Sequence, residues 1–174
     1  RKVFRIGFNV DSERPDANCY DLLASEARIA SLLAIAARDV PFDHWMHLSR
    51  PFASLSGNVC LLSWSGTMFE YLMPTLFTGY RRGTLLGDSC LAAVKRQERY
   101  CAEKGLPWGI SESGYFRFDQ GRHYQYMAFG VPGLGFKRGL EDALVIAPYA
   151  SLLALPVDLE AVMKNLERIR ELGG

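Results

Sequence analysis

The sequence predicts an all-α fold in which helices are joined by long loops. Several segments show the 3.6-residue periodicity of amphipathic helices, and nothing alternates in the βαβ pattern of a parallel sheet. The chain has 174 residues, 49% apolar and 22% charged, which is typical of a globular domain with a substantial core. We therefore expect a single domain over residues 1–174.

Five segments carry the helical pattern. In the first, Leu22, Ile29 and Leu33 form an apolar stripe, and Arg28 falls on the opposite, outer side. This helix is expected to end before Pro41, because a residue that precedes proline disfavours helix. Asp158 is the expected N-cap of the last helix, at residues 159–172. Gly105 is expected to end the third helix, at residues 85–104. The predicted helices are residues 18–38, 67–77, 85–104, 144–155 and 159–172.

The connections at residues 39–64 and 105–140 are long and rich in aromatic residues and glycine. Long loops inside a compact domain are usually functional, so we expect both to gather at one end of the molecule. Residues 59–63 could form a short strand or an extended lead-in to the second helix.

Charge and composition exclude several classes of ligand. The net charge is +1, so no strong positive field exists to attract nucleic acid, and a neutral polymer fits better. His44 and His47 lack an acidic third ligand at a suitable spacing, and we expect no metal and no cofactor. The cysteines form no CxxC pair and are expected to be reduced; they are Cys19, Cys60, Cys90 and Cys101. No stretch approaches the roughly 20 apolar residues that span a bilayer.

Three glutamates are candidates for acid–base chemistry. Glu26 falls on the apolar stripe of the first helix, where an unpaired charge would be costly unless it faces a cavity. Glu112 lies among aromatic residues, a setting that raises the pKa of a carboxyl group into the general-acid range. Glu70 lies in the first turns of a helix, where it could instead form a cap. A buried salt bridge to an arginine is the structural alternative for each.

Aromatic residues at helix ends and in loops are candidates for sugar binding. The apolar faces of sugars pack on such rings, while phenol and indole groups can donate hydrogen bonds. The candidates for substrate binding are Tyr20, Trp64, Trp108, Tyr115, Tyr126 and Tyr149.

Several motifs, in the same order along the chain, resemble the glycoamylase-like region of cyclic β-1,2-glucan synthases. They include Pro107-Trp-Gly-Ile-Ser-Glu-Ser and Tyr126-Met-Ala-Phe-Gly-Val-Pro-Gly-Leu-Gly. The other matching motifs are residues 8–11, 20–28, 62–74 and 147–150. This resemblance implies an (α/α)6 toroid that holds the sugar in a central cleft. A full toroid needs about twelve helices, so we expect only a partial toroid, whose apolar flank would favour self-association.

The resemblance also implies a function. In such synthases this region is part of a larger membrane-associated protein, on the cytoplasmic side of the inner membrane, and cyclises linear β-1,2-glucan by transglycosylation. A β-1,2-glucan hydrolase is the alternative enzyme, and a non-catalytic glucan-binding or scaffolding fragment is the alternative of another class. We expect the 174 residues by themselves to be weakly active or inactive.

Cleavage of a glycosidic bond takes an acid and a second carboxylate that acts as nucleophile or base. Glu112 is the expected acid, because its segment is aromatic and belongs to a distinctive motif. Glu26 is the expected second carboxylate, because its helical face is otherwise apolar. Glu70 is the reserve.

Overall fold

The protein has a mixed α/β fold. A computed structural model describes residues 2–55 and 57–173. Within these residues three two-stranded antiparallel hairpins accompany the helices. They are β1 (Phe8–Asn9) with β2 (Arg14–Pro15), β3 (Phe52–Leu55) with β4 (Asn58–Leu61), and β5 (Glu112–Phe118) with β6 (Tyr124–Ala128). The prediction of an all-α fold, as part of an (α/α)6 toroid, is therefore wrong for this chain.

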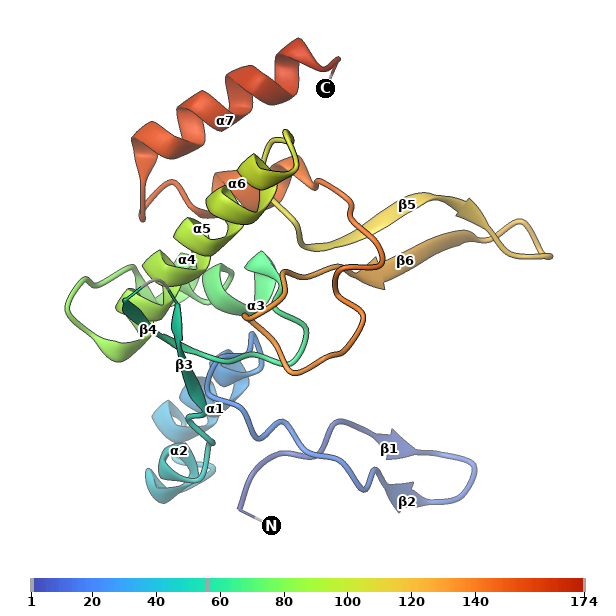
Figure 1. Ribbon diagram of the computed structural model, residues 1–174. Helices are drawn as coiled ribbons and strands as arrows, with labels where there is room; N and C mark the ends of the chain where they lie inside the picture. The colour runs from blue at the N-terminus through green and yellow to red at the C-terminus, as the bar shows by residue number, and fades with distance from the viewer. Residues whose placement is uncertain (1, 56, 174) are drawn as a thin grey trace.

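The helices are short except for α5 and α7. Their bounds are α1 (Arg28–Ala36), α2 (Asp43–Met46), α3 (Met68–Leu72), α4 (Thr75–Thr78), α5 (Leu85–Glu103), α6 (Pro148–Leu153) and α7 (Leu159–Glu171). Figure 1 shows α5 crossing the middle of the molecule. No helix in the described part of the chain is both long and apolar enough to cross a membrane.

The predictions for α5 and α7 are confirmed almost to the residue. The Asp158 carboxylate accepts a hydrogen bond from the Ala161 N–H at 3.0 Å, as an N-cap does. Thr84 caps α5 in the same way, through the Gly87 N–H. Gly105 follows α5 with a φ of 72°, the left-handed conformation that commonly ends a helix.

The first predicted helix is only half formed, and its buried face is not the predicted one. Residues 18–27 are not helical, and the Leu23 N–H bonds to the Ser49 carbonyl at 2.9 Å. Leu33, expected inside, is 65% exposed, whereas Arg28, expected outside, is 4% exposed. The cause is that Arg28 bonds to backbone carbonyls beneath it, and this fixes which face of α1 turns inward.

The core is built around α5, which packs against the β3–β4 hairpin and α3. Its largest fully buried side chains include Tyr71, Met68, Leu61 and Leu72. The Tyr71 hydroxyl lies 2.6 Å from the Leu61 carbonyl oxygen and 2.7 Å from that of Leu134, and so links segments distant in sequence. The β1–β2 and β5–β6 hairpins project from this body on the same side in Figure 1.

Candidate active site

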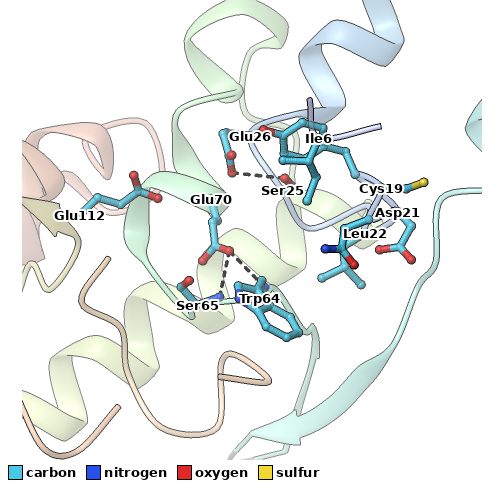
Figure 2. Close-up of a pocket in the computed structure, with 12 residues that line it drawn as sticks. Ile6, Cys19, Asp21, Leu22, Ser25, Glu26, Trp64, Ser65, Glu70 and Glu112 are labelled. Atoms are coloured by element: carbon cyan, nitrogen blue, oxygen red, sulfur yellow. Dashed lines mark hydrogen bonds between the residues drawn. The ribbon is translucent and has the colours of Figure 1, made fainter. Parts of the chain in front are cut away.

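A pocket of about 570 Å³ lies where the two projecting hairpins leave the body of the protein. Its walls come from the base of the β1–β2 hairpin, the segment before α1, the loop before α3 and the first residue of β5. All three candidate glutamates line it, and Figure 2 shows the Glu112 side chain directed toward Glu26 and Glu70. The lining residues are Ile6, Asn18, Cys19, Tyr20, Asp21, Leu22, Ser25, Glu26, Trp64, Ser65, Glu70 and Glu112.

Glu70 is the most buried of the three, at 5% exposed. It forms a capping box with Thr67 at the start of α3, because each side chain accepts a hydrogen bond from the other's backbone N–H. Its Oε1 accepts from the backbone N–H groups of Trp64 and Ser65, at 3.1 and 3.0 Å (Figure 2). The hydroxyl groups of Ser63 and Thr67 donate to its Oε2.

These contacts give Glu70 a structural task. Burial raises the pKa of its carboxyl group above the ordinary value, and the hydrogen bonds from the backbone and from Ser63 and Thr67 oppose that rise. Both oxygens are already occupied by donors, so the side chain fixes residues 63–67 in place. That loop carries Trp64, which is exposed at the pocket.

Arg28 ties the segment that carries Glu26 to α3. Its guanidinium group donates to the carbonyl oxygens of Ser25 at 2.9 Å, Glu70 at 2.9 Å and Tyr71 at 2.8 Å. Burial lowers the pKa of Arg28 from its ordinary value, although the neighbouring Glu26 charge opposes this. Within residues 2–55 and 57–173, no ion pair joins an arginine to any of the three glutamates, so the salt-bridge alternative is not observed.

Glu26 and Glu112 are partly buried and differ in their hydrogen bonds. Glu26 accepts from the Ser25 hydroxyl at 3.2 Å. Glu112 accepts a hydrogen bond from the Tyr126 hydroxyl, across the β5–β6 hairpin. The Tyr149 hydroxyl lies 2.8 Å from the Glu112 carbonyl oxygen, to which it donates, and so holds the start of β5 against α6.

Both carboxylates affect the pKa of the Tyr126 hydroxyl. Burial first, and then the hydrogen bond to Glu112, raise the pKa of this hydroxyl well above the ordinary value. The charge of Glu26 also contributes to this rise. Tyr126 therefore stays protonated at neutral pH and donates a hydrogen bond to Glu112.

The predicted aromatic residues divide into two groups. Tyr20 and Trp64 line the pocket, and Tyr126 and Tyr149 contact Glu112. Trp108 is instead a core residue, 6% exposed, beside a second cavity between α5 and α7.

Tyr115 faces away from Glu112, and its ring packs edge-on against Phe129 at 5.2 Å. Neighbouring residues on a strand point to opposite faces, which explains why Tyr115 turns toward the core. The structure therefore does not bring Trp108 or Tyr115 to the pocket.

Sequence reasoning missed other residues of the pocket. Asp21 adds a fourth carboxyl group, and the Ser49 N–H donates to its backbone carbonyl at 2.6 Å. Asn18, Cys19 and Ser25 also line the wall. These residues were assigned to a helix, and only the cluster of Asn, Asp and Ser within residues 16–25, typical of turns, could have indicated otherwise.

His44 is a structural residue. Its Nε2 lies 2.9 Å from the Ser31 hydroxyl, and its ring contacts that of Phe4 at 4.5 Å.

Two comparisons with known proteins show the family of this chain. Residues 18–174 match the glycoamylase family, described as "Putative glucoamylase". The chain is also 47% identical, over 173 residues, to the cyclic beta-(1,2)-glucan synthase NdvB of Rhizobium meliloti (strain 1021). That alignment covers 99% of this chain and 6% of the relative, so the chain spans a small part of that relative's length. The family match covers most of the chain and includes all three glutamates, and the chain therefore belongs to the glycoamylase family.

Proposed function

We propose that this chain forms the carbohydrate-processing site of a larger cyclic β-1,2-glucan synthase, and that it acts on linear β-1,2-glucan by transglycosylation. The observation that carries the proposal is that Glu26 and Glu112, 86 residues apart in sequence, line one pocket beside exposed aromatic rings. The name of the relative, to which nearly the whole chain aligns, supplies the substrate class.

The linkage of substrate and product sets the type of reaction. A linear β-1,2-glucan that becomes a cyclic β-1,2-glucan keeps the β configuration at the carbon whose bond is exchanged. Retention requires two successive displacements through a covalent glycosyl–enzyme intermediate. One carboxylate must therefore be ionised and act as nucleophile, while the other carries a proton.

The hydrogen bonds favour Glu112 as the nucleophile. The Tyr126 hydroxyl donates to its carboxylate and the Tyr149 hydroxyl holds the start of β5, so the Glu112 carboxylate is kept in one orientation, as attack on an anomeric carbon requires. Sequence reasoning gave Glu112 the role of the acid because of its aromatic surroundings. Because the contact with Tyr126 positions Glu112 for attack, we assign the acid role to Glu26, whose carboxyl group accepts a hydrogen bond from the Ser25 hydroxyl.

The proposed reaction has two displacement steps. A Glu112 carboxylate oxygen bonds to the anomeric carbon as the bond to the departing oxygen breaks, and Glu26 gives that oxygen its proton. A hydroxyl at the other end of the same glucan then attacks the anomeric carbon. Glu26 takes the hydroxyl proton, and the bond to Glu112 breaks. The ring closes without consumption of water, whereas attack by water would give the hydrolase alternative.

Tyr126 and Glu70 support this chemistry without taking part in it. Tyr126 orients the Glu112 carboxylate, and Glu70 holds the loop that presents Trp64 to the sugar. Both are positioning residues in the proposal.

The experiment is a comparison of variants of the full-length protein that contains these residues. Glu112→Gln and Glu26→Gln should each reduce turnover of linear β-1,2-glucan by a factor of about 10³ or more, while glucan binding persists. The matched control is Glu167→Gln, an exposed glutamate on α7, which should retain turnover. Undiminished turnover in either pocket variant would remove that residue from the mechanism.

A further inference from the structure

The β5–β6 hairpin carries a row of exposed aromatic side chains that the proposed reaction does not use. Beyond Tyr126 come Tyr124, Phe118 and Phe116, which are 57%, 48% and 88% exposed. Figure 1 shows that this hairpin projects from the body of the protein. Exposed rings gathered in a row are unusual on a protein surface and mark a binding site.

These rings touch one another in sequence along the hairpin. The centroids of Phe116 and Phe118 are 5.5 Å apart with an interplanar angle of 87°, and those of Phe118 and Tyr124 are 5.2 Å apart at 78°. Both contacts are edge-to-face, an arrangement that aromatic pairs favour. Each ring therefore holds its neighbour in a defined orientation although solvent surrounds them.

Gly114 makes the row continuous with the active site. A Cβ at this position would lie 3.1 Å from Cε1 of Tyr124, so the absence of a side chain lets the Tyr124 ring lie across β5. Gly114 is also opposite Tyr126 in the register, and Tyr124 and Tyr126 share a face because they are two residues apart. The same face thus runs from Glu112 through Tyr126 to Tyr124 and to Phe118, which is paired with Tyr124. Phe116 extends the row through its ring contact with Phe118, beyond the point where the register of β5 shifts.

The other face of the hairpin is already occupied. Tyr115 packs there against Phe129, and Met127 packs against the core. The aromatic row is therefore left on the side that begins at Glu112. A β-strand rises about 3.3 Å per residue, and β5 is irregular between Tyr115 and Phe118, so its seven residues extend over less than about 20 Å, still enough for more than one sugar unit.

We infer that this face binds the part of a β-1,2-glucan chain that extends beyond the carboxylate pocket. Phe116, Phe118 and Tyr124 offer apolar faces to the C–H groups of successive glucose units, and the Tyr124 hydroxyl can hydrogen-bond to sugar hydroxyls. The inference rests on the proposed function, because the occupant is identified by the continuity of this face with Glu112. It adds a distal binding site and predicts a preference for long chains.

The test compares ligands of two lengths. Binding of a long linear β-1,2-glucan and of a β-1,2-linked glucose trisaccharide is measured by calorimetry with full-length protein carrying Glu26→Gln, so that the glucan is not consumed. The test variant adds Phe116→Ser, Phe118→Ser and Tyr124→Ser. Phe77→Ser, at an exposed ring on α4, is the matched control.

Loss of stacking by these rings should raise the Kd for the long glucan about tenfold or more and leave the Kd for the trisaccharide unchanged. The control should bind both ligands as the parent protein does.

Three outcomes would overturn the inference. If the parent protein and the test variant bind the long glucan with equal affinity, the inference is wrong but the proposed function stands. A change of sedimentation mass in the test variant, with glucan affinity unaltered, would identify the face as a contact between copies of the protein. Failure of the parent protein to bind β-1,2-glucan of any length would overturn the proposed function as well.

Discussion

Replacement of Arg28 by methionine tests how the site is held together. Methionine fills much of the same volume, but it cannot donate to the carbonyl oxygens of Ser25, Glu70 and Tyr71. A buried polar group left without its partner costs about 1–3 kcal/mol, and relief of the cost of burying the Arg28 charge offsets part of the sum. We expect Arg28→Met to lower the free energy of unfolding by about 3–5 kcal/mol.

For a chain of this length such a loss lowers Tm by roughly 6–20 °C. Urea denaturation at pH 7, followed by far-UV circular dichroism, measures the change in the free energy of unfolding. The matched control is Arg138→Met at an exposed arginine, which should change that free energy by less than about 0.5 kcal/mol. A loss below about 1 kcal/mol for Arg28→Met would refute the view that this guanidinium group anchors the Glu26 segment on α3.

Three further predictions concern other parts of the structure. Tyr126→Phe should lower kcat about tenfold or more with KM nearly unchanged, because it removes only the donor to Glu112; a rise in KM alone would contradict that role. Maleimide should react at pH 8 with the thiol of Cys19, which lines the pocket, and bound glucan should protect that thiol. The thiols of Cys60, Cys90 and Cys101 should react only after unfolding, because burial raises their pKa values to about 12, about 11 and about 11, respectively. Asp158→Ala should cost about 1–2 kcal/mol at pH 7, since it removes an N-cap and the contact with Lys95 that lowers the pKa of Asp158. The Asp158 carboxylate stabilises the fold fully above its unfolded pKa of 3.8 and loses this effect as the pH falls through its lower folded-state pKa. The difference in free energy of unfolding between parent and variant, measured by urea denaturation, should therefore shrink below pH 3.8, and a constant difference would argue against this role.

Local rules were sufficient for the elements that carry their own boundary signals. The helices α5 and α7 begin at capping residues and keep one apolar face, and α6 begins at Pro148, where proline is tolerated. The predicted helix at residues 67–77 proved to be two helices, α3 and α4, which meet at Pro74. Of the two alternatives for residues 59–63, a strand or an extended lead-in, the strand is confirmed in part by β4, which ends at Leu61.

Tertiary contacts decided the parts that sequence reasoning missed. The β5–β6 hairpin was assigned to a loop, although its aromatic residues favour strands and Gly121 lies in the turn between them. Residues 18–27 have a helical pattern, yet they pair with Ser49 and face the pocket. The helical periodicity also predicted that Arg28 is exposed to solvent. It is buried instead because its guanidinium group donates to three carbonyl oxygens, two of which belong to a distant segment and cannot be found from local sequence.

The gathering of Glu26, Glu70 and Glu112 in one pocket could not be derived from local rules, since the contacts that create it join distant segments. Their residue types and surroundings made all three candidates, and all three also lie in the motifs that carry the family resemblance. Their different hydrogen bonds, with Tyr126 on Glu112 and a capping box on Glu70, emerge only from the folded chain.

The central claim is that this site exchanges a β-1,2 linkage within one glucan chain without adding water. Mass spectrometry of the products formed from linear β-1,2-glucan by the full-length protein tests it most directly. We expect rings that are lighter by one water than linear chains of the same number of glucose units, and we expect no rings from the Glu112→Gln variant. Linear chains as the only products would show that the acceptor is water or a second glucan chain, and an unaltered polymer would contradict the catalytic role.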